Sequence, residues 1–202
     1  MKLIILGHPG SGKGTVSERV AKDFRLLHIS VGDLLRTEAK KKTTLGRKIS
    51  SYIDRGDLVP YQLAVHLAKK AISKKNNYLI DGFPRSLEQA KEIEDLKIDL
   101  VIYLDVPEKE VIKRLSGRLL DPVTGKTYHL KYLPPPKNIV KRLVQRKDDT
   151  PKVIKERFNV YHRETEPVIK YYQKKGILKK IDGMGSPNEV YQKVKRVVQD
   201  GY

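Results

Sequence analysis

The fold is decided by the stretch Gly7-His8-Pro9-Gly10-Ser11-Gly12-Lys13-Gly14-Thr15, which directly follows the apolar run Leu3-Ile4-Ile5-Leu6. A glycine, four residues and then Gly-Lys-Thr form the P-loop pattern, which joins a strand to a helix and wraps backbone N–H groups around phosphate oxygens. In such a loop Lys13 reaches the β- and γ-phosphates, and Thr15 is placed to ligate magnesium. The stretch therefore predicts a nucleoside triphosphate site formed by Gly10, Ser11, Gly12, Lys13, Gly14 and Thr15.

Outward from this loop, short β-rich runs alternate with helical periodicity. Strands are expected at 2–6, 28–30, 78–80, 100–106 and 178–182, and helices at 12–24, 61–75, 86–96, 107–118, 151–175 and 186–199. This alternation predicts an α/β fold of three layers, in which helices cover a central sheet of five parallel strands. Residues 30–59 and 117–149 interrupt the rhythm, and we expect them to be moving parts inserted into one core domain of 1–29, 60–116 and 150–202.

The amino-acid composition limits the binding partners and the kinds of chemistry that can be expected. The net charge of +18 is compatible with nucleic acid, an anionic surface or small anionic substrates as partners. With no Trp and only three Phe, the chain has few stacking platforms for nucleic acid, so none is expected as a partner. The absence of Cys excludes disulfides and thiolate chemistry. No apolar run approaches 18 residues, so we expect a soluble, intracellular protein without a membrane segment.

Acidic and basic side chains follow special local sequence at several points. The apolar run Tyr78-Leu79-Ile80 ends in Asp81, a carboxylate placed to orient magnesium-bound water. Arginines occur in Gly32-Asp33-Leu34-Leu35-Arg36, in Asp81-Gly82-Phe83-Pro84-Arg85, and at positions 114, 118, 146 and 157. Arg114 and Arg118 are four residues apart in an expected helix, which predicts that they point the same way.

These segments, with Arg146-Lys147-Asp148-Asp149, make the chain resemble the adenylate kinases over nearly its whole length. The resemblance implies an AMP-binding flap at about 30–59 and a lid at about 117–149 that closes over the donor nucleotide. It implies reversible, Mg²⁺-dependent phosphoryl transfer from ATP to AMP, giving two ADP. The attacking AMP phosphate is already anionic, so catalysis needs alignment and charge stabilisation rather than a general base, and no histidine is assigned to it.

The resemblance also assigns roles to individual residues. It makes Lys13, Arg85, Arg118, Arg146 and Arg157 the catalytic set. Against the donor nucleotide it places the P-loop residues together with Arg114, Arg118, Thr127, Tyr128 and the backbone of Gly185. For AMP it implies contacts from Val31, Arg36, Asp57, Leu58, Val59, Gly82, Phe83, Pro84, Arg85, Gln89, Arg146 and Arg157, with Gln89 recognising the adenine edge.

Several departures from the family pattern leave alternatives open. Val31 stands where many adenylate kinases have threonine, which bears on acceptor choice. Segments 14–19 and 171–176 look like the mitochondrial GTP:AMP phosphotransferase branch, so GTP is the alternative donor and the mitochondrial matrix the alternative to the cytoplasm. Asp121 stands where some metal-free relatives have histidine, and a lid without Cys is not expected to hold zinc. A monomer is expected, and a basic P-loop protein that binds nucleic acid is the remote alternative.

Overall fold

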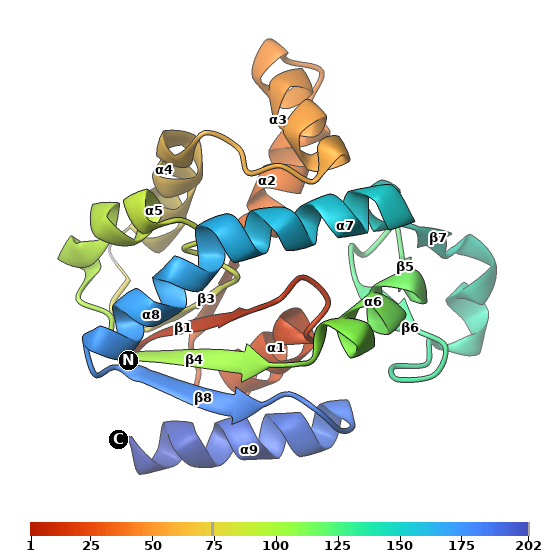
Figure 1. Ribbon diagram of the computed structural model, residues 1–202. Helices are drawn as coiled ribbons and strands as arrows, with labels where there is room; N and C mark the ends of the chain where they lie inside the picture. The colour runs from red at the N-terminus through yellow and green to blue at the C-terminus, as the bar shows by residue number, and fades with distance from the viewer. Residues whose placement is uncertain (74, 202) are drawn as a thin grey trace.

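A parallel five-stranded sheet forms the centre of the computed structural model, which describes residues 1–73 and 75–201. The strands are β1 (Lys2–Gly7), β2 (Leu27–Ser30), β3 (Tyr78–Asp81), β4 (Leu100–Asp105) and β8 (Leu178–Asp182), in the order β2-β3-β1-β4-β8 (Figure 1). Asp81 lies opposite Ile5 of β1 and Ser30 of β2 in the strand register. The carboxyl ends of these three strands therefore meet at the edge where the P-loop begins, and the predicted five-stranded parallel sheet is confirmed.

Helices cover both faces of this sheet, as the alternation of buried side chains along β1 requires. Leu3 and Ile5 pack against α1 (Lys13–Asp23) and α9 (Pro187–Asp200). Ile4 and Leu6 belong to the core cluster that α4 (Tyr61–Ile72), α5 (Leu87–Glu92) and α8 (Glu166–Lys174) complete on the other face. The result is the expected three-layer α/β architecture.

Two segments project from this core (Figure 1). Residues 30–59 form α2 (Val31–Ala39) and α3 (Thr44–Arg55). Residues 117–149 contain β5 (Arg118–Leu120), β6 (Thr127–His129) and β7 (Val144–Gln145), an antiparallel sheet of order β6-β5-β7, and the 3-10 helices Lys137–Arg142 and Lys147–Asp149. The second segment is reached through α6 (Glu108–Ser116) and left through α7 (Pro151–Val160).

The predicted helix 107–118 is wrong at its end, because α6 stops at Ser116 and Arg118 belongs to strand β5. Gly117 separates the two, and a Cβ at that position would lie 2.4 Å from Nε2 of His129 on β6. Glycine is therefore needed at this junction, and the backbone of Arg118 follows the small sheet, in which it pairs with His129. Arg114 and Arg118 do not share a helical face.

Other helix boundaries also differ from the predicted ones. The stretch 86–96 divides into α5 and the 3-10 helix Glu94–Leu96, and α4 ends at Ile72, while position 74 of the predicted helix 61–75 lies outside the described residues. The stretch 151–175 is interrupted by a π-helical turn, Tyr161–Thr165, between α7 and α8. Across residues 1–73 and 75–201, no helix is both long and apolar enough to cross a membrane.

Candidate active site

A cavity of about 370 Å³ lies where the P-loop, residues 30–59 and residues 117–149 face one another. The P-loop contributes residues 9–15, the helical insertion contributes Arg36 and 56–59, and the small sheet contributes Arg118 and 125–129. A cavity at the carboxyl ends of parallel strands is the usual place for a ligand in an open α/β sheet. Its charged lining indicates what kind of ligand it can hold.

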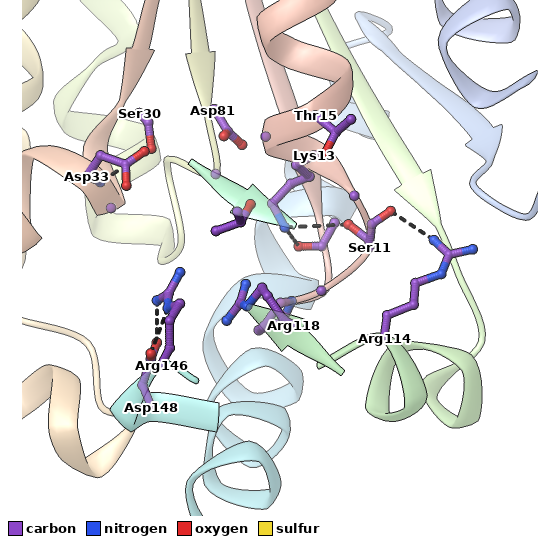
Figure 2. Close-up of a pocket in the computed structure, with 18 of the residues that line it drawn as sticks. Ser11, Lys13, Thr15, Ser30, Asp33, Asp81, Arg114, Arg118, Arg146 and Asp148 are labelled. Carbon is purple, nitrogen blue, oxygen red and sulfur yellow. Dashed lines mark hydrogen bonds and ion pairs between the residues drawn. The ribbon is translucent and has the colours of Figure 1, made fainter. Parts of the chain in front are cut away.

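Lys13 lies at the centre of the P-loop, at the first position of α1. Its Nζ donates hydrogen bonds of 2.7 Å to the backbone carbonyl oxygens of Gly7 and His8. Figure 2 shows the Lys13 side chain turned back toward Ser11 of the same loop. Gly10 and Gly12 adopt φ of +85° and +94°, and a Cβ at Gly10 would lie 2.6 Å from Cγ of Leu115, so the loop requires glycine there. Burial lowers the pKa of Lys13 to about 7, although Asp81 opposes this shift. A polyanion bound in the loop would favour the charged ammonium.

Thr15 follows Gly14 in α1, Asp81 ends β3, and both line the cavity. A Cβ at Gly14 would be 3.4 Å from Oδ2 of Asp81, which shows how closely the carboxylate approaches the start of α1. Over the described part of the chain, no group of three or more His, Cys, Asp or Glu side chains could hold a metal ion. One hydroxyl and one carboxylate fit Mg²⁺ bound mainly by water and phosphate oxygens, the arrangement this ion favours.

Three arginines of the cavity are held by two buried carboxylates. Arg146 donates to Asp148 at 2.8 and 2.5 Å (Figure 2). Arg118 donates from Nε and Nη2 to Asp149 at 2.7 and 2.5 Å. Arg157 Nη1 donates to one carboxylate oxygen of each aspartate at 3.1 Å. Burial alone would raise the pKa of Asp148, but the hydrogen bonds from Arg146 hold it well below its ordinary value.

This cluster therefore contains more positive than negative charge and lies away from bulk water. Burial, together with the nearby Arg118, lowers the pKa of Arg157 to about 9. An unbalanced group of guanidinium ions in a cavity is stabilised by an incoming anion, and arginine matches phosphate with paired hydrogen bonds.

Two further arginines converge from the opposite side of the cavity. Arg36 of α2 pairs with Asp33, and Arg85 Nε donates to the carbonyl oxygen of Gly82 at 2.6 Å. A Cβ at Gly32 would lie 3.3 Å from Arg36 Nη1 and 3.5 Å from Arg85 Nη2, so the two guanidinium groups face the same point. The cavity thus presents a second anion-binding position opposite the P-loop.

A family model for adenylate kinase matches residues 5–177 of the chain. This chain belongs to the adenylate kinase family. Adenylate kinase from Shouchella clausii is 39% identical over an alignment covering 99% of each chain. Adenylate kinase from Clostridium kluyveri is 38% identical with 96% of each covered, and that from Staphylococcus epidermidis is 40% identical with 94% of this chain and 95% of the relative covered.

In this adenylate kinase-family structure, Arg114 connects α6 to two loops. Its guanidinium donates to the carbonyl oxygen of Ser11 at 3.3 Å (Figure 2). It also donates to the carbonyl oxygen of Gly183 at 3.3 Å and lies 5.7 Å from the ring centroid of Tyr132. Thr127, Tyr128 and Gly185, predicted as donor contacts, line the same cavity. Arg114 and Tyr132 both line the cavity beside the P-loop.

Most residues predicted from the sequence line the cavity, including the whole P-loop set and all five predicted catalytic side chains. Within the described chain, four predicted AMP contacts are not among the lining residues: Val31, Phe83, Pro84 and Gln89. Val31 and Phe83 are buried in the hydrophobic core, and Gln89 Oε1 accepts a hydrogen bond of 2.7 Å from the Arg85 backbone N–H.

Sequence reasoning missed several lining residues: His28, Ser30, Asp33, Tyr132, Asp148 and Thr165. Ser30 is the last residue of β2, and His28 lies two positions before it. The rule that ligands bind at the carboxyl ends of parallel strands could have identified both as site residues. Thr165 carries no comparable signal, because a threonine inside a helical pattern is unremarkable in sequence.

Proposed function

We propose that this adenylate kinase-family chain transfers a phosphoryl group reversibly from Mg²⁺-bound ATP to AMP, giving two ADP. The observation that carries the proposal is one cavity with a P-loop on one side, Arg36 and Arg85 on the other, and three arginines between them. Two nucleotides with about six negative charges would repel each other strongly in water. Lys13 and the arginines offset that repulsion and allow the two phosphates to approach.

In the proposed reaction, an oxygen of the AMP phosphate forms a bond to the γ-phosphorus while the bond from that phosphorus to the β,γ-bridging oxygen breaks. No proton needs to move, so catalysis depends on alignment and charge stabilisation. Lys13, Arg118, Arg146 and Arg157 would stabilise the transferring group, whose charge spreads over its equatorial oxygens. Magnesium, held through Thr15 and water on Asp81, would neutralise β- and γ-phosphate oxygens when bound.

On the acceptor side, Arg36 and Arg85 would hold the AMP phosphate. Residues 57–59 line the cavity beside them and are proposed to shape the AMP pocket largely through backbone. Gln89 is proposed to recognise the adenine edge, with Val31 and 82–84 completing the pocket. The side-chain oxygen of Gln89 is bonded to Arg85, so adenine recognition would use its amide nitrogen.

The two insertions are proposed to act as moving parts. The lid, residues 117–149, would close over the donor through Thr127 and Tyr128, and the flap, residues 30–59, would close over AMP. Closure would exclude water that otherwise competes as phosphoryl acceptor.

The GTP:AMP alternative is not favoured, since the relatives named above are adenylate kinases and not GTP:AMP phosphotransferases. Action on small nucleotides rather than nucleic acid, a monomeric state, a cytoplasmic location with the mitochondrial matrix as alternative, and a zinc-free lid stay predictions.

The proposal is tested by coupled diphosphate formation with ATP, GTP, CTP and UTP as donors and AMP, CMP and UMP as acceptors. Rapid turnover with ATP and AMP is expected, with the other acceptors poor. A strong preference for GTP would replace the donor assignment. A pure preparation that binds nucleotides but transfers no phosphate would overturn the proposal.

A further inference from the structure

The π-helical turn Tyr161–Thr165 joins α7 to α8 within a single helical rod. The backbone N–H of Glu166 donates to the carbonyl oxygen of Tyr161, five residues earlier, so the turn holds one residue more than an α-helical turn. Such turns are less stable than regular helix and are frequent at functional sites. The two ends of this turn contact different parts of the site.

The first residue of the turn contacts the donor side of the cavity. Tyr161 is buried, and its ring lies 3.8 Å from the ring of His8 in the P-loop, centroid to centroid, at an interplanar angle of 30°. One turn earlier, Arg157 binds Asp148 and Asp149. The end of α7 and the start of the π-helical turn therefore contact the P-loop and the buried aspartates beside it.

The last residue of the turn contacts the acceptor side. Thr165 is 5% exposed, lines the cavity, and donates a hydrogen bond of 2.9 Å from Oγ1 to the backbone carbonyl oxygen of Arg85. A threonine hydroxyl in a helix ordinarily returns to a carbonyl of its own helix three or four residues earlier. Here the hydroxyl instead reaches a residue 80 positions away.

Arg85 is held through its whole backbone by this arrangement. Its N–H donates to Gln89 Oε1 at 2.7 Å, its carbonyl oxygen accepts from Thr165, and its side-chain Nε donates to Gly82 at 2.6 Å. Gln89 and Gly82 belong to the same local segment as Arg85. Thr165 links the Arg85 backbone to the continuous helix of α7, the π-helical turn and α8, which also contacts the P-loop through Tyr161.

We propose that Thr165 is a positioning residue for the acceptor-side arginine, which fixes Arg85 relative to the P-loop through the π-helical turn. The inference rests on the proposed function. Phosphoryl transfer is sensitive to misplacement of about 1 Å, so releasing the Arg85 carbonyl impairs both AMP binding and alignment. Donor binding at Lys13 and the P-loop makes no contact with the Thr165 hydroxyl and is left intact.

The test compares Thr165→Val, which keeps the shape and removes the hydroxyl, with Thr165→Ser, which keeps the hydroxyl. The valine variant is expected to raise the KM for AMP about 3- to 10-fold, the effect of one neutral hydrogen bond, and to lower kcat, with the KM for ATP within about twofold of wild type. The serine variant is expected to restore both constants. Ser116→Ala is the matched control, because that hydroxyl donates to Ile112 of its own helix.

An unchanged KM for AMP in Thr165→Val, or equal defects in the valine and serine variants, would overturn the inference. So would a parallel rise in both KM values accompanied by a lower Tm. Thr165→Ala, read out in the same way, serves if the valine variant does not fold. AMP binding measured calorimetrically without donor separates the two proposals, because it tests Thr165 even if the wild-type protein transfers no phosphate.

Discussion

The stability of the fold should depend on pH through His8. Its side chain is 7% exposed and stacks on Tyr161, and its Nδ1 has no hydrogen-bond partner within the described residues. Burial, reinforced by the charges of Lys13 and His162, lowers the pKa of His8 to about 4, while Glu166 and Asp105 oppose the shift. Because the unfolded chain binds this proton more readily, stability is lost as pH falls below about 6.5 and continues to fall toward 4.

The size of this effect follows from the two pKa values. Linkage between about 6.5 and 4 gives roughly 2 kcal/mol less stability at pH 5 than at pH 7.5. Water in the adjoining cavity, which Gly7 and Pro9 line, reduces the penalty, so a loss of about 1–2 kcal/mol is expected.

Urea unfolding at pH 7.5, 6 and 5 measures this loss, with His8→Phe as the variant that keeps the stacked ring and cannot titrate. The difference in unfolding free energy between pH 7.5 and 5 should be smaller in His8→Phe by about 1–2 kcal/mol. His66→Phe, which removes an exposed histidine of α4, corrects for the loss of a histidine elsewhere. Equal pH dependence in wild type and His8→Phe would refute the reasoning.

Three further outcomes are expected. Lys13→Ala and Arg85→Ala should each lower kcat/KM by orders of magnitude with little change in Tm. Lys22→Ala, which removes an exposed lysine on the same helix as Lys13, should resemble wild type. Wild-type activity in Lys13→Ala or Arg85→Ala would contradict the assignment. Asp121→Asn should speed hydrogen exchange of the backbone amides in the lid, because the wholly buried carboxylate accepts 2.9 and 2.6 Å hydrogen bonds from Arg142. Unaltered exchange would show that this ion pair does not stabilise the lid. Excess EDTA should abolish turnover, recoverable with Mg²⁺, without lowering Tm; a lower Tm would point to a structural metal.

The central sheet and the P-loop were predictable because their signals are local. An apolar run, a glycine-rich loop and a helix follow one another directly, and Asp81 closes another apolar run. The site's arginines could be named from sequence segments, yet their aspartate partners could not. Pairing such as that of Arg118 with Asp149, 31 residues apart, depends on how the lid folds back, and periodicity carries no information about it.

The incorrect helix boundary has the same origin. The helical pattern runs smoothly through 107–118, and it does not show that Arg118 pairs with His129 in the small sheet, so that α6 ends before it. The side-chain oxygen of Gln89 is committed to the Arg85 backbone, which the sequence does not reveal. Pairing between residues distant in the sequence decided the helix boundary, whereas the Gln89 contact is local but invisible to periodicity.

Because the π-helical turn contains one extra residue, insertions and deletions near it should have different effects on folding. Deleting one residue from 161–165 would convert the turn to ordinary α-helix and leave α7 and α8 nearly in place. An insertion of one residue within α8 would instead rotate everything beyond it by about 100° and expose Val168 and Tyr172. A one-residue deletion is therefore the milder change for folding. Removal of one of residues 162–164 would bring Tyr161 and Thr165 one position closer along the helix, so their contacts with His8 and with the Arg85 carbonyl could not both be kept. A folded protein with a misaligned site is the expected product.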